Sequence, residues 1–128
     1  MVRRVVADPE RRVGGQAQEP AQVRRVLTLD DPGRNNSSVL RGDVVAEVSK
    51  LRRELDGEIV VYGSRRLAHT LIEHDLADEL RLMAHPVVLG AGERVFGGTS
   101  DGKAVRLLGN RTVGDGLACL TYELVRDA

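Results

Sequence analysis

The sequence predicts an α/β protein in which helices flank a mixed β-sheet. Two observations carry this prediction. Short apolar segments alternate with amphipathic helical segments between residues 23 and 84, and a glycine-rich stretch with two-residue periodicity follows. A strand–helix–strand–helix–strand order requires parallel strands joined by crossovers, whereas closely spaced strands favour antiparallel pairing. The 128 residues are enough to bury one hydrophobic core.

The amino-terminal residues show no periodic pattern. Arg, Pro, Gly and Gln are mixed through residues 1–22, so we expect a poorly ordered leader there, with no core element in residues 1–20. A single, partial domain is placed at residues 23–128. Its first strand is predicted at residues 23–29, because the Val/Leu-rich run ends in the turn signal DDPG at 30–33. A polar loop is expected across residues 35–38.

Two helices and a buried strand follow. Apolar residues spaced i, i+4, i+7 and i+11 predict one helix over residues 44–55, with Asp43 at its positive end and Gly57 after it. The run IVVY at 59–62 is typical of a strand buried on both faces of a parallel sheet. Gly63 and Ser64 end that strand. A second helix is predicted over residues 65–74, and its buried side comprises Leu67, Ala68, Leu71 and Ile72.

The last third of the chain is predicted to be antiparallel. A strand is expected at residues 80–84, and eight of the 14 glycines lie between Gly90 and Gly116. They separate three further predicted strands, at residues 94–96, 103–113 and 117–125. Cys119 alternates with apolar neighbours in the last of these, so we expect a buried, inert thiol.

Composition excludes several classes of function. The 19 Lys and Arg residues balance 19 Asp and Glu residues, so no net charge attracts the molecule to nucleic acid or to an anionic membrane. Tyr62, Phe96 and Tyr122 are too few to form a base-stacking surface. No apolar run approaches the roughly 20 residues that span a bilayer, and residues 1–20 lack a signal peptide's apolar core. A chain with one cysteine forms no internal disulfide, and we expect a cytoplasmic location.

The run IVVYGSRRL at 59–67 is the strongest candidate site. It is an apolar strand that ends in Gly-Ser directly before a helix. Free amides and the helix dipole at such a position favour an anion, so a phosphate could lie on Ser64 and Arg65. The alternative is that Gly63 only turns the chain and Ser64 only caps the helix. The run matches neither a Walker loop nor the GxGxxG fingerprint.

Other polar residues give weaker signals. His69 and His74 are five residues apart, which is not the i, i+4 spacing that converges on a metal, and His85 precedes Pro86. We predict no metal site. Asp78 and Glu79 are interpreted as a surface turn before a strand. No serine lies in a GxSxG or SxxK pattern, and no catalytic residue is assigned.

Several motifs together carry a resemblance to a known family. They are DPGRNNSSVL at 31–40, RGD at 41–43, IVVYGSRRL at 59–67 and ADELRLMAHPVVLGAGERVF at 77–96. The chain resembles the dihydrofolate reductase-like family between about residues 28 and 123. Within that family it is similar to the C-terminal reductase domain of the bifunctional riboflavin-biosynthesis deaminase-reductase.

The resemblance implies a fold and a reaction. The fold is a mixed sheet flanked by helices, formed by a βαβαβ unit and antiparallel C-terminal strands, and the molecule is a homodimer. The reaction is the NADPH-dependent reduction of a small molecule, either a 5-amino-6-ribosylaminopyrimidine or a pteridine-type compound. The family's cofactor phosphates lie against the turn that maps here onto Gly63, Ser64, Arg65 and Leu67.

The chain also departs from the family pattern. The family's leading strand, its substrate-lining loop and its Gly-Arg-x-Thr segment are not recognisable, and Arg34 stands where an aromatic residue is common. We therefore expect an N-terminally truncated reductase domain. A sheet without its leading strand exposes an apolar edge, which favours self-association. The alternative function is a catalytically inactive remnant or a homodimerisation module of the same fold.

Overall fold

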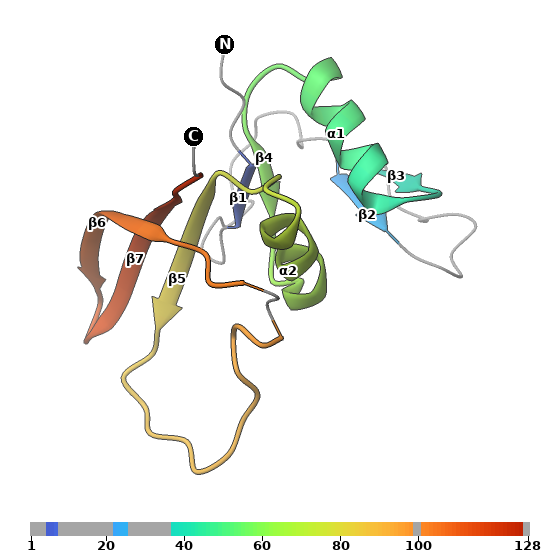
Figure 1. Cartoon of the computed structure of the whole chain (residues 1–128). Coiled ribbons are helices and arrows are strands. Elements are labelled where there is room, and N and C mark those ends of the chain that lie inside the picture. The colour runs from blue at the N-terminus through green and yellow to red at the C-terminus, as the bar shows by residue number, and fades with distance from the viewer. Residues whose placement is uncertain (1–4, 8–21, 26–36, 99–100, 127–128) are drawn as a thin grey trace. The chain divides into compact units, whose positions relative to one another are not determined.

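The computed structural model describes residues 5–7, 22–25, 37–98 and 101–126 (Figure 1). The chain divides into two compact units. One unit contains Met1–Glu10 and Asp56–Ala128, and the other contains Arg11–Leu55.

The larger unit contains a five-stranded mixed sheet in the order β4-β1-β5-β7-β6. Strands β1 (Val5–Ala7), β4 (Ile59–Val61) and β5 (Glu79–Ala84) are parallel. Strand β7 (Leu117–Leu124) is antiparallel both to β5 and to β6 (Val105–Val113). The predicted mixed sheet, parallel first and antiparallel afterwards, is therefore confirmed.

Strand β1 corrects the expectation that residues 1–20 contribute no core element. Val5–Ala7 pair with β4 on one side and with β5 on the other, so they lie inside the sheet. The signal is short: two valines and an alanine, followed by the turn-forming pair Asp8-Pro9. Pairing with two neighbours provides the backbone hydrogen bonds that so short a strand lacks alone.

The start of the predicted βαβαβ unit also needs correction. Residues 22–25 do form a strand, β2 (Gln22–Arg25), but it belongs to the smaller unit. There it pairs in parallel with β3 (Ser37–Leu40), a segment whose first residues were expected in a polar loop. The third parallel strand of the large sheet is β1, so the crossover from β4 to β5 spans it. The strand expected at residues 94–96 is absent from the described residues, where that segment is irregular.

Both predicted helices are confirmed. Helix α1 (Val44–Glu54), in the smaller unit, begins after Asp43, whose carboxylate accepts a 2.9 Å hydrogen bond from the Ala46 amide. Val44 and Val48 are its buried residues. Helix α2 (Arg65–Glu73), in the larger unit, buries Leu71 and Ile72. Its end is closed by Asp75, which has a positive φ of 54°, and by a hydrogen bond from the Leu76 amide to the Leu71 carbonyl. No helix among the described residues is both long enough and apolar enough to span a membrane.

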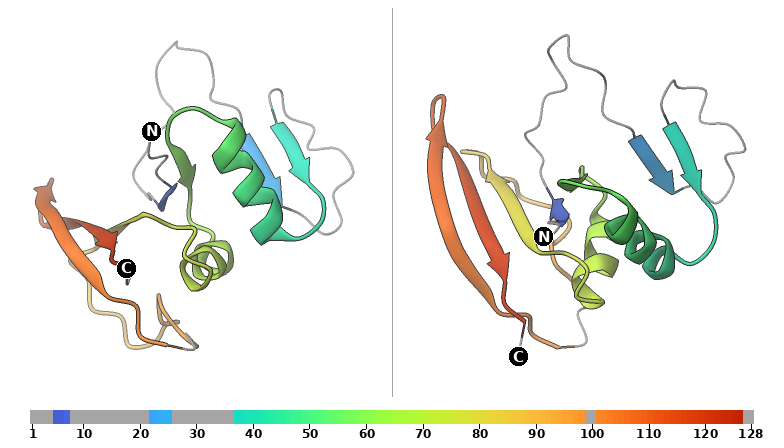
Figure 2. Two further views of the ribbon diagram at one scale, coloured as in Figure 1. Left: turned by 45° about the horizontal axis from the view of Figure 1, so that its top comes forward. Right: turned by 90° about the horizontal axis from the view of Figure 1, so that it is seen from above.

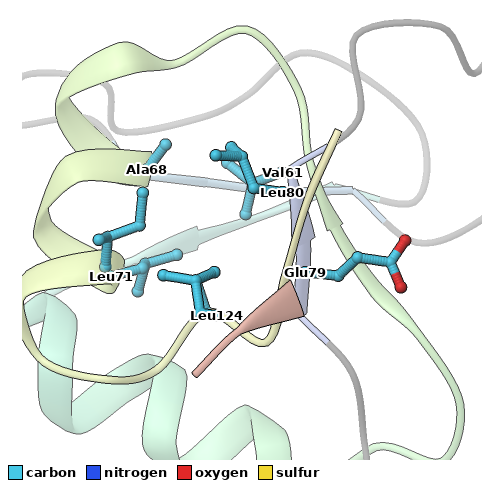
Figure 3. Close-up of a pocket in the computed structure, with 8 residues that line it drawn as sticks. Val61, Ala68, Leu71, Glu79, Leu80 and Leu124 are labelled. Atoms are coloured by element: carbon cyan, nitrogen blue, oxygen red, sulfur yellow. The ribbon is translucent and has the colours of Figure 1, made fainter. Parts of the chain in front are cut away.

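The core of the larger unit lies between α2 and one face of the sheet. Leu71, Leu80 and Leu124 point toward one another there (Figure 3). The cavity among them has a volume of about 10 Å³, which is hardly enough for one water molecule. This cavity is part of the packing and does not form a ligand pocket.

Charged residues lie on the opposite face of the sheet, at the start of β5. The Glu79 side chain points away from the leucine cluster (Figure 3), although Glu79 is only 5% exposed. Its carboxylate accepts a 2.7 Å hydrogen bond from Arg81, which also lies 3.2 Å from Glu58. Across the strand pair, Glu79 is opposite Glu123, which is itself paired with Arg106. Interleaved arginines thus compensate two carboxylates that would otherwise repel each other.

Strand β6 forms the edge of the sheet beside β7 (Figure 2). Eight of its nine residues are exposed, including Val105, Leu107 and Leu108 at between 46% and 49%. The strand pairing shifts register between Leu107 and Gly109, as at a β-bulge. An apolar edge strand therefore remains on the surface of the larger unit.

Candidate functional site

The turn between β4 and α2 is built by two consecutive tight hydrogen bonds. The Ser64 amide donates to the Tyr62 carbonyl at 2.6 Å, and the Arg65 amide donates to the Gly63 carbonyl at 3.1 Å. Each bond links residues i and i+2, which is the pattern of a γ-turn. Gly63, at the centre of the first, has φ +57°, a region that side-chain-bearing residues rarely adopt. The sequence places a glycine where this turn requires one.

The surface over the turn is open. No atom of the described residues lies within 4 Å of the position that a Cβ at Gly63 would occupy, and Ser64 and Arg65 are both exposed. A ligand group can therefore approach the backbone directly at this point.

The first turn of α2 leaves backbone donors available. Ser64 is the N-cap residue, but its side chain makes no capping hydrogen bond. Its carbonyl accepts the Ala68 amide at 2.9 Å, whereas within the described chain the amides of Arg66 and Leu67 have no backbone acceptor. These are the two donors that an N-cap side chain usually satisfies. The Ser64 side chain therefore makes no capping hydrogen bond, whereas Gly63 turns the chain as the structural alternative expects.

The first turn of α2 also carries positive charge. It contains Arg65 and Arg66 and no acidic residue. The positive end of the helix dipole and two guanidinium groups thus coincide, which favours a bound anion.

The Arg65 side chain contacts a distant segment of the chain. Its Nη1 donates a 2.7 Å hydrogen bond to the Arg94 carbonyl, and its Nη2 lies 3.0 Å from the Glu93 carboxylate. Both partners belong to the long loop between β5 and β6 (Figure 1). The sequence did not predict this contact. The segment GAGERVF at 90–96 is part of the family resemblance, but nothing in it indicates which helix it would contact.

The four predicted site residues therefore lie within one turn of backbone. Gly63 has the positive φ, and Ser64 begins the helix without a side-chain cap. The Leu67 amide has no backbone acceptor among the described residues, and the Arg65 guanidinium contacts the loop. Leu67 itself is half-buried, so its contribution to an anion would be its N–H group.

The other candidate residues are part of the packing and ion pairing of the fold. Glu79 lies inside β5, which corrects its interpretation as part of a surface turn, and Asp78 pairs with Arg126 at 2.5 Å. Cys119 is buried, as predicted. Among the described residues, no three His, Cys, Asp or Glu side chains gather where they could hold a metal ion.

Comparison with known proteins gives a family match. The family model described as "RibD C-terminal domain" matches residues 1–119. An uncharacterized protein, YyaP from Bacillus subtilis (strain 168), is 32% identical over 88 residues. The match covers 69% of this chain and 47% of that relative, so the chain spans about half the relative's length.

Solved structures share the fold. A putative riboflavin biosynthesis protein from Shewanella sp. PV-4 aligns with a TM-score of 0.71 at 16% identity, over 98% of this chain and 75% of that one. A pyrimidine reductase-like protein from Corynebacterium diphtheriae aligns with 0.58 at 18% identity, over 71% and 40%. RibD from Acinetobacter baumannii gives 0.53 at 16% identity, over 71% and 27%. These likenesses confirm the predicted dihydrofolate reductase-like fold.

Proposed function

Because the chain belongs to the RibD C-terminal domain family, we propose that it is an NADPH-dependent reductase of a small molecule, a ribosylaminopyrimidine or a pteridine-type compound. Two structural neighbours support this proposal by name, one as a riboflavin biosynthesis protein and one as pyrimidine reductase-like. The observation that carries the proposal is the open, uncapped start of α2, where the amides of Arg66 and Leu67 are available.

The residues of the turn fit the phosphates of such a cofactor. A phosphate can contact the backbone at Gly63 because no side chain in the described part of the protein fills that space. The Arg66 and Leu67 amides and the Ser64 hydroxyl can donate hydrogen bonds to its oxygens, and Arg65 adds a positive charge. These groups bind and orient, and none of them transfers a proton.

A bound dihydronicotinamide supplies the hydride, so the reaction needs no protein nucleophile. The protein's part is to hold the cofactor in position beside the substrate and to limit access of water. No residue of the chain is assigned as the proton donor.

Calorimetric titration of NADPH tests the cofactor site. We expect binding to the wild-type chain and a loss of at least about tenfold in Ser64→Asp, because a carboxylate at the N-cap both occupies the free amides and repels phosphate. The same substitution stabilises α2, so weaker binding could not be attributed to unfolding. Asn110→Asp, which adds the same charge on exposed β6, is the matched control and should bind like the wild type. Equal binding by Ser64→Asp, or none by the wild type, would reject the site.

A homodimerisation module is the second candidate, and the exposed edge strand β6 favours it. Val105, Leu107 and Leu108 are each about half exposed, and apolar surface of this kind is typical of association sites. We propose that the chain forms a homodimer, whether or not it is active. Sedimentation should show a dimer that Leu107→Arg weakens, and Ala46→Arg, at an exposed position of α1, is the charge-matched control. NADPH consumption with a pyrimidine or pteridine substrate would exclude the inactive remnant.

We also propose a cytoplasmic location. The chain's single cysteine, Cys119, is buried and forms no disulfide, which is compatible with a reducing compartment. Fractionation of cells that express the tagged chain tests this proposal.

A further inference from the structure

The Arg65 guanidinium, the main charge of the proposed cofactor site, is held by the chain itself. Its two terminal nitrogens contact two consecutive residues of the β5–β6 loop, the Glu93 carboxylate and the Arg94 carbonyl. The partners are 28 and 29 residues away in sequence, so only the folded chain brings them together.

Glu93 supplies the negative charge that the first turn of α2 lacks. That turn has no acidic residue, and a carboxylate near a helix start is stabilising. Glu93 therefore offers Arg65 what a phosphate would offer, an anionic oxygen at a hydrogen-bonding distance of 3.0 Å. A phosphate and the Glu93 carboxylate would use the same nitrogen, Nη2.

We propose that Glu93 is a built-in competitor of the phosphate group at Arg65. This inference rests on the proposed cofactor site. Without nucleotide, Glu93 holds Arg65 against the loop. When a phosphate binds, it displaces the Glu93 carboxylate from Nη2, and the loop loses its charged contact with α2.

The exposure of the pair makes the displacement easy. The side chains of Arg65 and Glu93 are 49% and 81% exposed, so water replaces each partner readily. Ion pairs exposed to this degree change an equilibrium constant by up to about fivefold. A contact of that strength tunes affinity without blocking the site.

The glycines of the loop allow it to move when the contact is lost. Within residues 5–7, 22–25, 37–98 and 101–126, no atom lies within 4 Å of the position that a Cβ at Gly90, Gly92 or Gly97 would occupy, and Gly98 has φ +68°. Glycines of this kind allow backbone changes at little steric cost. Binding of the nucleotide and release of the loop are therefore coupled.

The test compares NADPH affinity in the wild type, in three single variants and in one double variant. Glu93→Gln keeps the size of the side chain and removes its charge, and we expect it to bind NADPH about two- to fivefold more tightly than the wild type. Glu54→Gln is the matched control, since Glu54 is an exposed residue of α1 that pairs with Lys50, and it should not change the affinity. The gain in NADPH affinity must also disappear when Glu93→Gln is introduced into a protein that already carries Arg65→Gln. Unchanged or weaker binding by Glu93→Gln would overturn the inference.

Inorganic pyrophosphate separates this inference from the proposed function. If wild-type protein fails to bind NADPH, the proposed function is rejected, and the competition is then measured with pyrophosphate alone. Tighter pyrophosphate binding by Glu93→Gln than by the wild type supports the competition. Equal binding, or binding by neither protein, overturns it. If NADPH binds but Glu93→Gln gains nothing, only the inference fails.

Trypsin cleavage after Arg94 reports whether the β5–β6 loop is held against α2. We expect NADPH to accelerate cleavage at this bond in the wild type, because the loop keeps only the Arg94 carbonyl contact with Arg65 and loses the Glu93 contact. In Glu93→Gln, cleavage should be fast already without nucleotide. Protection of the bond by NADPH would contradict the proposed release.

Discussion

The two halves of the large sheet differ in how they are covered. Strands β4 and β5 lie against α2, where Leu71 is 1% exposed and Leu80 is 7% exposed. Strand β6, at the other end, is exposed along nearly its whole length. The helix-covered half is therefore expected to carry the stability of this unit and to hold the candidate site at the start of α2. The β6 half leaves surface exposed that a partner can cover.

The largest expected contrast between the halves comes from leucine truncation. Leu71→Ala should lower the free energy of unfolding by about 2–5 kcal/mol, because Leu71 is 1% exposed and its removal leaves a cavity. Leu107→Ala, on β6, should change it by no more than about 0.5 kcal/mol. Urea denaturation of both variants measures the difference. Similar losses would show that the exposed strand is as well packed as the covered one.

The buried carboxylate gives the second contrast. Glu79→Gln should cost about 1–3 kcal/mol, because Glu79 is 5% exposed and its bond to Arg81 is charge-assisted. Its cross-strand neighbour Glu123 is more exposed, so Glu123→Gln should cost less than about 1 kcal/mol. Urea denaturation ranks the stability losses of the two variants. A larger loss in Glu123→Gln than in Glu79→Gln would contradict the argument from burial.

Backbone conformation gives a smaller contrast, between the site and the loop. Gly63→Ala should cost about 1–2 kcal/mol through its positive φ alone, since no described residue would contact the added Cβ. Gly90→Ala has equal space and no positive φ, so it should be neutral or slightly stabilising. Thermal unfolding of the two variants isolates the backbone effect. Equal stability would mean that the turn relaxes to a conformation that alanine accepts.

The smallest effect concerns a contact that links the two halves. Lys103, just before β6, donates a 2.9 Å hydrogen bond to Asp75, just after α2. This bond raises the pKa of Lys103 above its ordinary value of 10.5. A raised pKa stabilises the fold below about pH 10.5, and the stabilisation is lost as the pH rises through the folded-state pKa. Lys103→Met should therefore be slightly less stable than the wild type at pH 8, and the difference should shrink as the pH rises above 10.5. Denaturation at a series of pH values measures it.

The sequence predicted the positions of helices and strands better than it predicted which strands pair with each other. Asp43, the apolar stripe after it and the IVVY run placed α1 and β4 almost to the residue, because capping and periodicity are local properties. Three residues of β1 were missed because so short a run gains its stability from two neighbouring strands and gives little local signal. The strand at β3 was missed for a similar reason, since two serines conceal its pairing with β2.

The candidate site also combines residues that the sequence predicted with a contact that it did not predict. Gly63 and Ser64 could be chosen from the sequence, because a strand that ends in Gly-Ser before a helix has a local physical meaning. The contact of Arg65 with Glu93 could not, because nothing local links residues 28 positions apart.

The sequence by itself determined α1, α2 and β4, the turn and the residue types at the start of α2, since each follows from interactions within a few residues. Only the tertiary structure decided that β1 lies between β4 and β5, that Glu79 is buried, and that a loop carboxylate pairs with Arg65. The physical reason is that strand pairing, burial and charge pairing depend on which distant segments meet. Many partners are compatible with the same local pattern, and the choice among them is made when the whole chain packs.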